Sequence, residues 1–323
     1  MVGEDILRMV FAFVHPSSVL AMSLTCVKFR ALRPTGTIVT DVVAMNGSLV
    51  VYKWAMSLGC PPLSCVLDLK NLFWASRLVA LRQLAALGSA VVELHVYSVV
   101  PMLADCDARV RYWAVETLFT VKPMLHAWFA GTVVHKLDDS DSSVRHIVVQ
   151  TLGKVAPAVI ARHACAIAMA LCDDVPNVRH AALVALGKLD PTVLSRHVAA
   201  VLPTLEDEDR FVRRAAVDVL DKLDTAVFAY HAGAVVRMFG DYDCFVRQAA
   251  LDAMRKLDPI ELYRYYGFVA NMLADSESHV RDAAICTLRM MESISWHVID
   301  GDVAEKGRLS RSVMLDRATA PHF

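Results

Sequence analysis

Carboxylates and arginines crowd together in one stretch of the sequence, LEDEDRFVRRAAVDVLDKLD, residues 205–224. Four acidic residues, 206–209, stand directly before Arg210, Arg213 and Arg214. Such a cluster can transfer protons as an acid–base pair, hold a metal cation, or form ion pairs that only support the fold. The elements that carry these residues decide which of the three applies.

An aspartate and an arginine recur together along the chain with a constant spacing of 34 residues. Val directly precedes each Arg, and the Asp lies six residues before it. The six pairs are Asp105 and Arg111, Asp139 and Arg145, Asp173 and Arg179, Asp207 and Arg213, Asp241 and Arg247, and Asp275 and Arg281. A divergent first unit has Arg77 in the same spacing but lacks the Asp. A catalytic pair is expected once, whereas an unbroken period of this length indicates stacked repeats.

Two helices are predicted in each repeat. The first has apolar residues at spacings of four, three and four, which lie on one face of a helix, as in 194, 198, 201 and 205. The second begins at the Val-Arg pair, with Asp209 placed as a helix cap in its repeat. In four repeats it ends near a lysine, a cation that suits the negative end of the helix dipole. These lysines are Lys154, Lys188, Lys222 and Lys256.

The repeated phrase L-x-D-x-[DE]-x-x-V-R-x-x-A-x-x-x-L resembles the HEAT repeat, including its PBS-lyase-like variants. A 34-residue period also suits tetratricopeptide repeats, but their Trp, Leu-Gly and Tyr landmarks are missing. The resemblance implies an all-α fold, a right-handed α-solenoid of about seven two-helix HEAT repeats over residues 71–292 with a helical N-terminal cap. It also implies that each Asp pairs with the Arg of its own or a neighbouring repeat, forming a structural ladder.

The same resemblance places the second helices on the concave surface, where two positions vary from repeat to repeat. They are the residue after Val-Arg and the residue four further on, which share one helix face. This variation predicts a recognition surface, and the alternative is that these side chains are only solvated. The candidate partner-binding residues are Tyr112, Glu116, His146, Gln150, His180, Arg214, Asp218, Gln248 and Asp252. Their mixed charge favours a protein or peptide over nucleic acid.

The remaining chemistry-bearing residues predict no enzyme, no cofactor and no metal site. Histidines 95, 163, 197 and 231 share one repeat position with Phe129 and Tyr265, which indicates half-buried packing. A bilin-lyase-like activity is a weaker alternative, because no nucleophile or acid–base group supports it. The eight cysteines are scattered without a CxxC pair, which favours a reduced intracellular compartment, cytoplasmic or nuclear. The net charge of −1 and the interrupted apolar stretch 9–27 predict no membrane partner.

The N-terminal segment 1–33 predicts an apolar helix, a turn containing proline and two further helices, with characteristic residues at Ile6, Leu7, Pro16, Leu20, Leu24 and Phe29. This pattern resembles an F-box. The resemblance implies docking on the linker protein of a cullin-type ubiquitin ligase (SCF type), with the repeats as substrate receptor. A helical cap on a plain repeat scaffold is the alternative. Residues 43–62, VAMNGSLVVYKWAMSLGCPP, resemble one ankyrin-type unit, so residues 34–70 are expected to form an ankyrin-like connecting helical segment, and residues 293–323 a polar tail.

Overall fold

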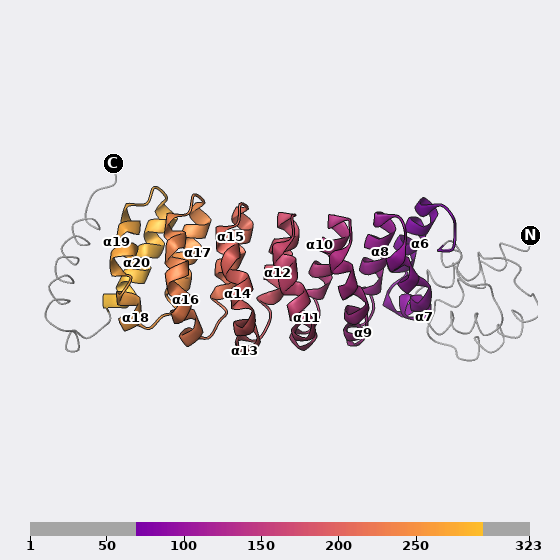
Figure 1. Cartoon of the computed structure of the whole chain (residues 1–323), viewed down its shortest axis with the longest axis horizontal. Helices are drawn as coiled ribbons and strands as arrows, with labels where there is room; N and C mark the ends of the chain where they lie inside the picture. The colour runs from indigo at the N-terminus through magenta and orange to yellow at the C-terminus, as the bar shows by residue number, and fades with distance from the viewer. Residues whose placement is uncertain (1–68, 293–323) are drawn as a thin grey trace, which may run out of the picture. The chain divides into compact units, whose positions relative to one another are not determined.

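The structure is a computed structural model that describes residues 69–292 (Figure 1). The F-box-like segment, nearly all of the ankyrin-like segment and the polar tail lie outside the described residues. Within residues 69–292 all regular structure is helical, which confirms the all-α prediction. The chain divides into two compact units, unit 1 (residues 1–193) and unit 2 (residues 194–323).

Unit 1 is a stack of helix pairs in which first helices alternate with second helices. The second helices are α6 (Trp74–Ala86), α8 (Ala108–Leu118), α10 (Ser142–Leu152) and α12 (Pro176–Leu186). The first helices are α7 (Ser89–Val99), α9 (Pro123–Val133) and α11 (Pro157–Met169). Short 3-10 helices follow them as η1 (Val100–Ala104), η2 (Val134–Asp138) and η3 (Ala170–Cys172). Each 3-10 helix leads into the turn that carries the ladder aspartate.

Unit 2 repeats this plan, and the boundary between the units falls within α13 (Pro191–Leu194). Its second helices are α15 (Arg210–Leu220), α17 (Cys244–Met254) and α20 (Ser278–Glu292). The first-helix layer contains η4 (Ser195–His197), α14 (Val198–Val201), α16 (Thr225–Arg237), α18 (Pro259–Tyr263) and α19 (Tyr266–Asn271). The 3-10 helices before the turns are η5 (Leu202–Glu206), η6 (Met238–Gly240) and η7 (Met272–Ala274).

The repeated apolar positions form the core of each unit. The predicted apolar face of the first helix, Leu194, Val198, Val201 and Leu205, is buried. The valine before the arginine is fully buried as well in six repeats, at positions 110, 144, 178, 212, 246 and 280. Successive second helices contact one another much more extensively than successive first helices do within each unit. The second helices therefore form the more closely packed layer.

Two of the first helices are broken, where the sequence predicted continuous ones. His197 (φ −109°, ψ 1°) ends η4 directly before α14, and Tyr265 (φ −103°, ψ 9°) lies between α18 and α19. At the second break the backbone N–H groups of Arg264 and Tyr265 bond to carbonyls three residues back rather than four. This tighter turn ends one helical segment before the next begins.

Aspartate side chains cap most of the second helices. Asp209 accepts hydrogen bonds from the backbone N–H groups of Phe211 at 2.8 Å and Val212 at 3.2 Å, which confirms its prediction as a cap. Asp107, Asp141 and Asp243 cap their helices in the same way. The repeat of α12 has Val175 at this position, which makes no side-chain cap, and Pro176 opens the helix.

Replacing Asp209 by Ala is expected to lower the free energy of unfolding by about 1 kcal/mol, because two N–H groups of α15 lose their acceptor. Urea unfolding of the full chain, followed by circular dichroism, measures the change. Asp209→Ser is the matched control, since serine can accept the same bonds and should retain most of the stability. Equal losses for the two variants would contradict a capping role.

Candidate functional site

Five of the ladder arginines bind the aspartate of the following repeat, 28 residues further along the chain. In each pair the Nε and Nη2 atoms of the arginine donate to the two carboxylate oxygens at 2.5 to 2.9 Å. The pairs in unit 1 are Arg77–Asp105, Arg111–Asp139 and Arg145–Asp173. Those in unit 2 are Arg213–Asp241 and Arg247–Asp275. The predicted ladder is therefore present in each unit and joins neighbouring repeats.

The aspartate of an arginine's own repeat contributes its backbone carbonyl instead of its carboxylate. Nη1 of Arg213 donates to the carbonyl oxygens of Asp207 at 2.9 Å and Glu208 at 3.1 Å. Nε of the same side chain reaches Asp241 Oδ2 at 2.6 Å. One planar guanidinium thus fixes its own turn and the next repeat together, using its several rigid donors. Arg179 makes the same turn contacts in unit 1, with the carbonyl oxygens of residues 173 and 174.

The electrostatics of the ladder keep its carboxylates ionised. Burial by itself would raise the pKa of Asp105, but hydrogen bonds from Arg77 and from the backbone N–H of Asp107 outweigh it, so the pKa is lowered. The pKa values of Asp139 and Asp173 are lowered by the same balance. For Asp275 the hydrogen bond from Arg247 is the largest influence and lowers the pKa. Carboxylates held in this way do not exchange protons near pH 7, which argues against acid–base catalysis.

Acidification should therefore destabilise the chain in two stages. Burial lowers the pKa of His95, His146 and His163 in the folded state, so stability falls as the pH drops below the unfolded histidine pKa of about 6.5. The lowered pKa values of the ladder aspartates contribute stability that is present above the unfolded aspartate pKa of about 3.9 and is lost below it. Thermal unfolding from pH 8 to pH 3 tests this, with Asp275→Asn expected to reduce only the second stage.

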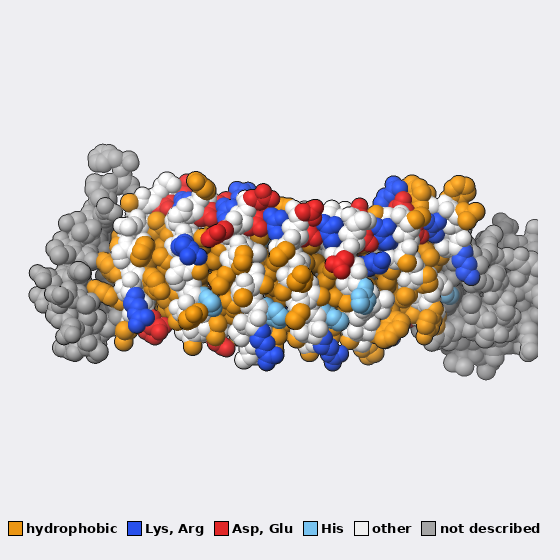
Figure 2. Space-filling model, in the orientation of Figure 1, with side chains coloured by type: hydrophobic (Ala, Val, Ile, Leu, Met, Phe, Trp, Pro, Cys, Tyr) orange, Lys and Arg blue, Asp and Glu red, His pale blue; other side chains and the backbone are white. Residues whose placement is uncertain are grey.

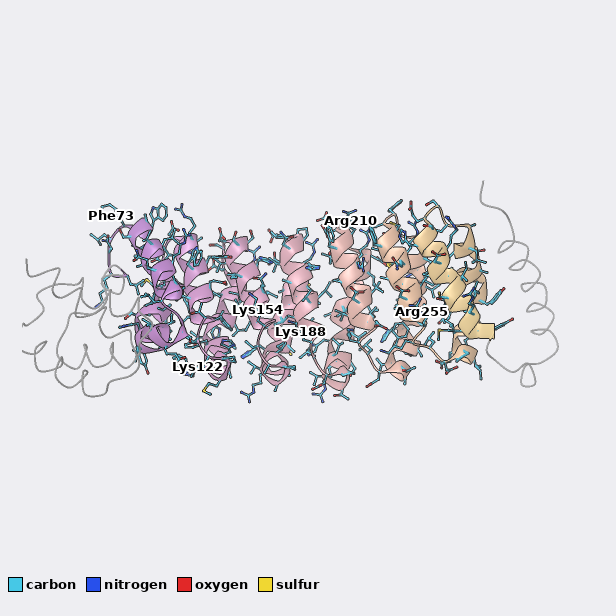
Figure 3. The ribbon with its side chains drawn as sticks, turned by 180° about the vertical axis from the view of Figure 1, so that it is seen from behind. Phe73, Lys122, Lys154, Lys188, Arg210 and Arg255 are labelled. Atoms are coloured by element: carbon cyan, nitrogen blue, oxygen red, sulfur yellow. The ribbon has the colours of Figure 1, made fainter. Side chains whose placement is uncertain are left out.

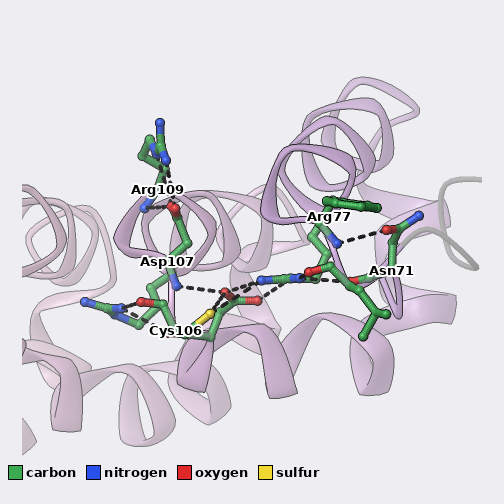
Figure 4. Close-up of polar contacts among 9 residues, drawn as sticks. Asn71, Arg77, Cys106, Asp107 and Arg109 are labelled. Atoms are coloured by element: carbon green, nitrogen blue, oxygen red, sulfur yellow. Dashed lines mark hydrogen bonds and ion pairs between the residues drawn. The ribbon is translucent and has the colours of Figure 1, made fainter.

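The two ends of the ladder differ from its middle. Asn71 lies 34 residues before Asp105, and its Oδ1 accepts the backbone N–H of Phe73 at 2.9 Å, as Asp105 Oδ1 accepts that of Asp107 at 2.9 Å (Figure 4). The first repeat lacks the Asp, as stated above, and Asn71 occupies its position, which was not predicted. At the other end, Nη1 of Arg281 donates to the carbonyls of Asp275 and Ser276. No carboxylate within residues 69–292 pairs with Arg281.

A second set of links joins the far ends of the second helices, from which Lys154 and Lys188 project (Figure 3). Nζ of Lys188 donates to the carbonyl of Gly153 in the preceding repeat at 2.6 Å. Nζ of Lys256 donates to the carbonyl of Asp221 in the same manner. The sequence predicted these lysines as partners of their own helix dipole, and it missed that they reach the C-terminal carbonyls of the neighbouring helix.

All nine predicted partner-binding residues lie on the solvent side of the second helices. Gln150, Arg214 and Asp218 are exposed, and the other six are half-buried. The members in unit 1 are Tyr112, Glu116, His146, Gln150 and His180, and those in unit 2 are Arg214, Asp218, Gln248 and Asp252. We call these positions the second-helix face of each unit. Charged side chains of both signs also gather along the edge of each unit where the second helices begin (Figure 2).

The second-helix face of unit 1 is mostly uncharged. Burial, with a contribution from the charge of Glu116, raises the pKa of Tyr112. Burial and the proximity of His180 lower the pKa of His146. One carboxylate oxygen of Glu116, Oε2, is buried without a hydrogen-bond partner within the described residues. This side presents neutral hydrogen-bonding groups rather than a charged patch.

The second-helix face of unit 2 carries the predicted charges, and beside it lies a row of aromatic side chains that was not predicted from the sequence. The guanidinium of Arg214 lies 5.8 Å from the ring centroid of Phe245 and 4.0 Å from Asp218. Phe245 in turn stacks on His279, with ring centroids 5.4 Å apart. Phe211 and Phe245 are 57% and 50% exposed, although phenylalanine is usually buried. The signal was available, because residues 211, 245 and 279 share one repeat position two residues before the ladder arginine.

The histidines of the first helices pack as predicted. His95, His163, His197, His231 and Tyr265 are half-buried, and Phe129 at the same repeat position is buried. Within residues 69–292 no group of three or more His, Cys, Asp and Glu side chains could hold a metal ion. In the same range no helix is both long and apolar enough to cross a membrane.

Comparison with known proteins supports a repeat solenoid. A family model for HEAT repeats matches residues 130–220 and 166–255. The archaeal HEAT-like repeats protein from Thermococcus onnurineus NA1 is similar in structure, with 15% identity, a TM-score of 0.52, and coverage of 72% of this chain and 98% of that one. An engineered protein of the Northeast Structural Genomics Consortium shows 16% identity, a TM-score of 0.55, and coverage of 78% and 74%. No curated protein matches the sequence.

Proposed function

We propose that this HEAT-repeat chain is a non-enzymatic scaffold that binds a protein or peptide along the second-helix face. One observation carries the proposal. On a backbone that repeats every 34 residues, the solvent-facing positions of the second helices vary, so that no two repeats carry the same pair of residues there, while the buried positions between them stay apolar. A surface that varies over a constant core can be complementary to a specific partner without disturbing the fold.

The packing of the two helix layers also supports the second-helix face as the binding surface. Second helices in each unit contact their neighbours more closely than first helices do, which is what we expect if they form the inner layer of the stack. The ladder ion pairs and the lysine links hold that layer at both of its ends. A partner would thus meet side chains whose positions are fixed before binding, which reduces the entropy cost of association.

Selection of peptides from a random display library on the immobilised full chain tests this proposal. Calorimetry with the selected peptides should show at least about fivefold weaker binding for Tyr112→Ala or Arg214→Ala, depending on which unit the peptide occupies. Arg162→Ala and Tyr230→Ala, at exposed positions of the first helices, are the matched controls and should bind normally. Peptides that respond only to the control substitutions would contradict the assignment.

The finer proposal is that this scaffold is the substrate-recognition subunit of a cullin-type ubiquitin ligase. Its support is the F-box-like pattern of residues 1–33 placed ahead of a repeat array in the sequence. In this proposal residues 1–33 dock on the linker protein of the ligase, and the second-helix face holds the substrate.

Co-purification with that linker protein distinguishes the ligase subunit from a plain scaffold. The full chain and Arg214→Ala should both retain the linker protein, whereas deletion of residues 1–33 or Leu20→Asp should lose it. If the deletion lowers the unfolding temperature but no variant changes linker capture, residues 1–33 act as a cap and the ligase proposal is wrong.

A further inference from the structure

A cleft of about 450 Å³ opens in unit 1 beside the Arg145–Asp173 ion pair. Its apolar wall consists of Leu137 from η2, Ala166 and Met169 from α11, and Ala170 from η3. Met169 is 74% exposed, which is unusual for so large an apolar side chain. The cleft lies at the joint between two repeats, and none of the nine residues of the second-helix face lines it.

Carboxylates dominate the polar lining of this cleft. Asp138, Asp139, Asp173 and Asp174 all line it, against a single lining cation, Arg145. The guanidinium groups of Arg111 and Arg145 neutralise Asp139 and Asp173, so two negative charges remain in excess. Lys136 is near enough to lower the pKa of Asp139 but does not line the cleft.

The two carboxylates in excess, Asp138 and Asp174, are accessible to a ligand. Asp174 accepts a bond from Arg145 Nη2 at 2.6 Å, yet its side chain is 84% exposed. Asp138 is exposed and has no ion pair within residues 69–292. A bound cation could contact both without breaking the ladder.

Lysine and arginine side chains combine a long apolar stem with a cationic end. The stem matches the wall formed by Leu137, Ala166 and Met169, and the charged end matches Asp138 and Asp174. We propose that this cleft receives a basic side chain, arginine or lysine, from an extended segment of a protein partner. The site is separate from the second-helix face, so it would add a second contact for a partner.

The corresponding positions of unit 2 show which residues set this preference. A shift of 68 residues places Leu205 and Glu206 at the positions of Leu137 and Asp138. The same shift replaces Met169 by Arg237 and Asp174 by Tyr242. Arginine and tyrosine at these positions remove the exposed carboxylate and add a positive charge. The fold therefore accommodates Met169→Arg and Asp174→Tyr, since equivalent positions already carry these residues.

Two labelled pentapeptides, Gly-Ala-Arg-Ala-Gly and its neutral analogue with citrulline in place of arginine, test the proposal with the full chain. Fluorescence anisotropy at low ionic strength should show about tenfold tighter binding of the arginine peptide, because two accessible carboxylates contribute roughly 1.4 kcal/mol. Met169→Arg and the double variant Asp138→Asn/Asp174→Asn should each abolish the preference. Glu206→Gln, at the corresponding position of unit 2, should leave it unchanged.

Cys172 lines the cleft and is exposed, so its chemistry reports where the peptide binds. The arginine peptide should slow alkylation of Cys172 by iodoacetamide several-fold while leaving Cys165, an exposed cysteine of α11, unaffected. Equal affinity for the two peptides would overturn the proposal. So would arginine-dependent binding that leaves the alkylation rate of Cys172 unchanged, because the site would then lie elsewhere. Neither outcome bears on the second-helix face.

Discussion

Replacing Asp241 by Ala is expected to lower the free energy of unfolding by about 3–5 kcal/mol, because the Arg213 guanidinium is left without its carboxylate. Only 13% of the Arg213 side chain and 5% of the Asp241 side chain are exposed, so water replaces the lost partner poorly. Asp241 Oδ1 also accepts the backbone N–H of Asp243 at 2.8 Å, and this bond is lost together with the ion pair. Urea unfolding of the full chain measures the effect.

An exposed ion pair in the same repeats provides the matched control. Arg210 and Asp243 approach to 3.1 Å, but the arginine side chain is 58% exposed. Arg210→Ala should therefore cost no more than about 1 kcal/mol. The double variant Arg213→Ala/Asp241→Ala should be less unstable than the two single losses added together, because removing both partners leaves no stranded charge. Similar losses for Asp241→Ala and Arg210→Ala would contradict a special role for the ladder.

Phe228→Ala is the second substitution with a large expected effect, about 3–5 kcal/mol. Phe228 belongs to α16 and is completely buried, so truncation removes apolar contacts and leaves a cavity. Repeats contact only their neighbours, so the loss of stability should be greatest in unit 2. It should appear as faster hydrogen exchange of the backbone amides of that unit. Hydrogen exchange monitored by mass spectrometry shows which amides lose protection.

Tyr230 is the control for this prediction because it lies on the same helix and is 86% exposed. Tyr230→Ala should change the free energy of unfolding by no more than about 0.5 kcal/mol. If both variants lose the same stability, the core of unit 2 is not organised around Phe228.

The features that the sequence predicted correctly are those that recur. The two helices of each repeat and the apolar face of the first helix were each supported by several copies of one pattern. A repeated pattern averages out local exceptions, so periodicity indicates core positions more reliably than any single segment does.

The features that escaped prediction depend on how one repeat meets the next. Sequence spacing alone could not decide whether Arg213 pairs with Asp207 or with Asp241, because that choice depends on the packing of neighbouring repeats. The breaks at His197 and Tyr265 arise from local backbone angles that have no residue signature here. The cleft beside Arg145 was missed because its residues come from separate turns and only the fold brings them together.

In all five ion pairs of the ladder the arginine reaches forward to the aspartate of the following repeat, and this directionality has a consequence for how the array can change in length. Deletion of residues 106–139 would remove Arg111 together with its partner Asp139, leaving Arg77–Asp105 and Arg145–Asp173 intact. Duplication of the same segment would add one complete pair. In-frame gain or loss of a whole 34-residue segment therefore creates no orphaned charge. The array can therefore be lengthened or shortened in steps of one repeat without stranding a ladder charge.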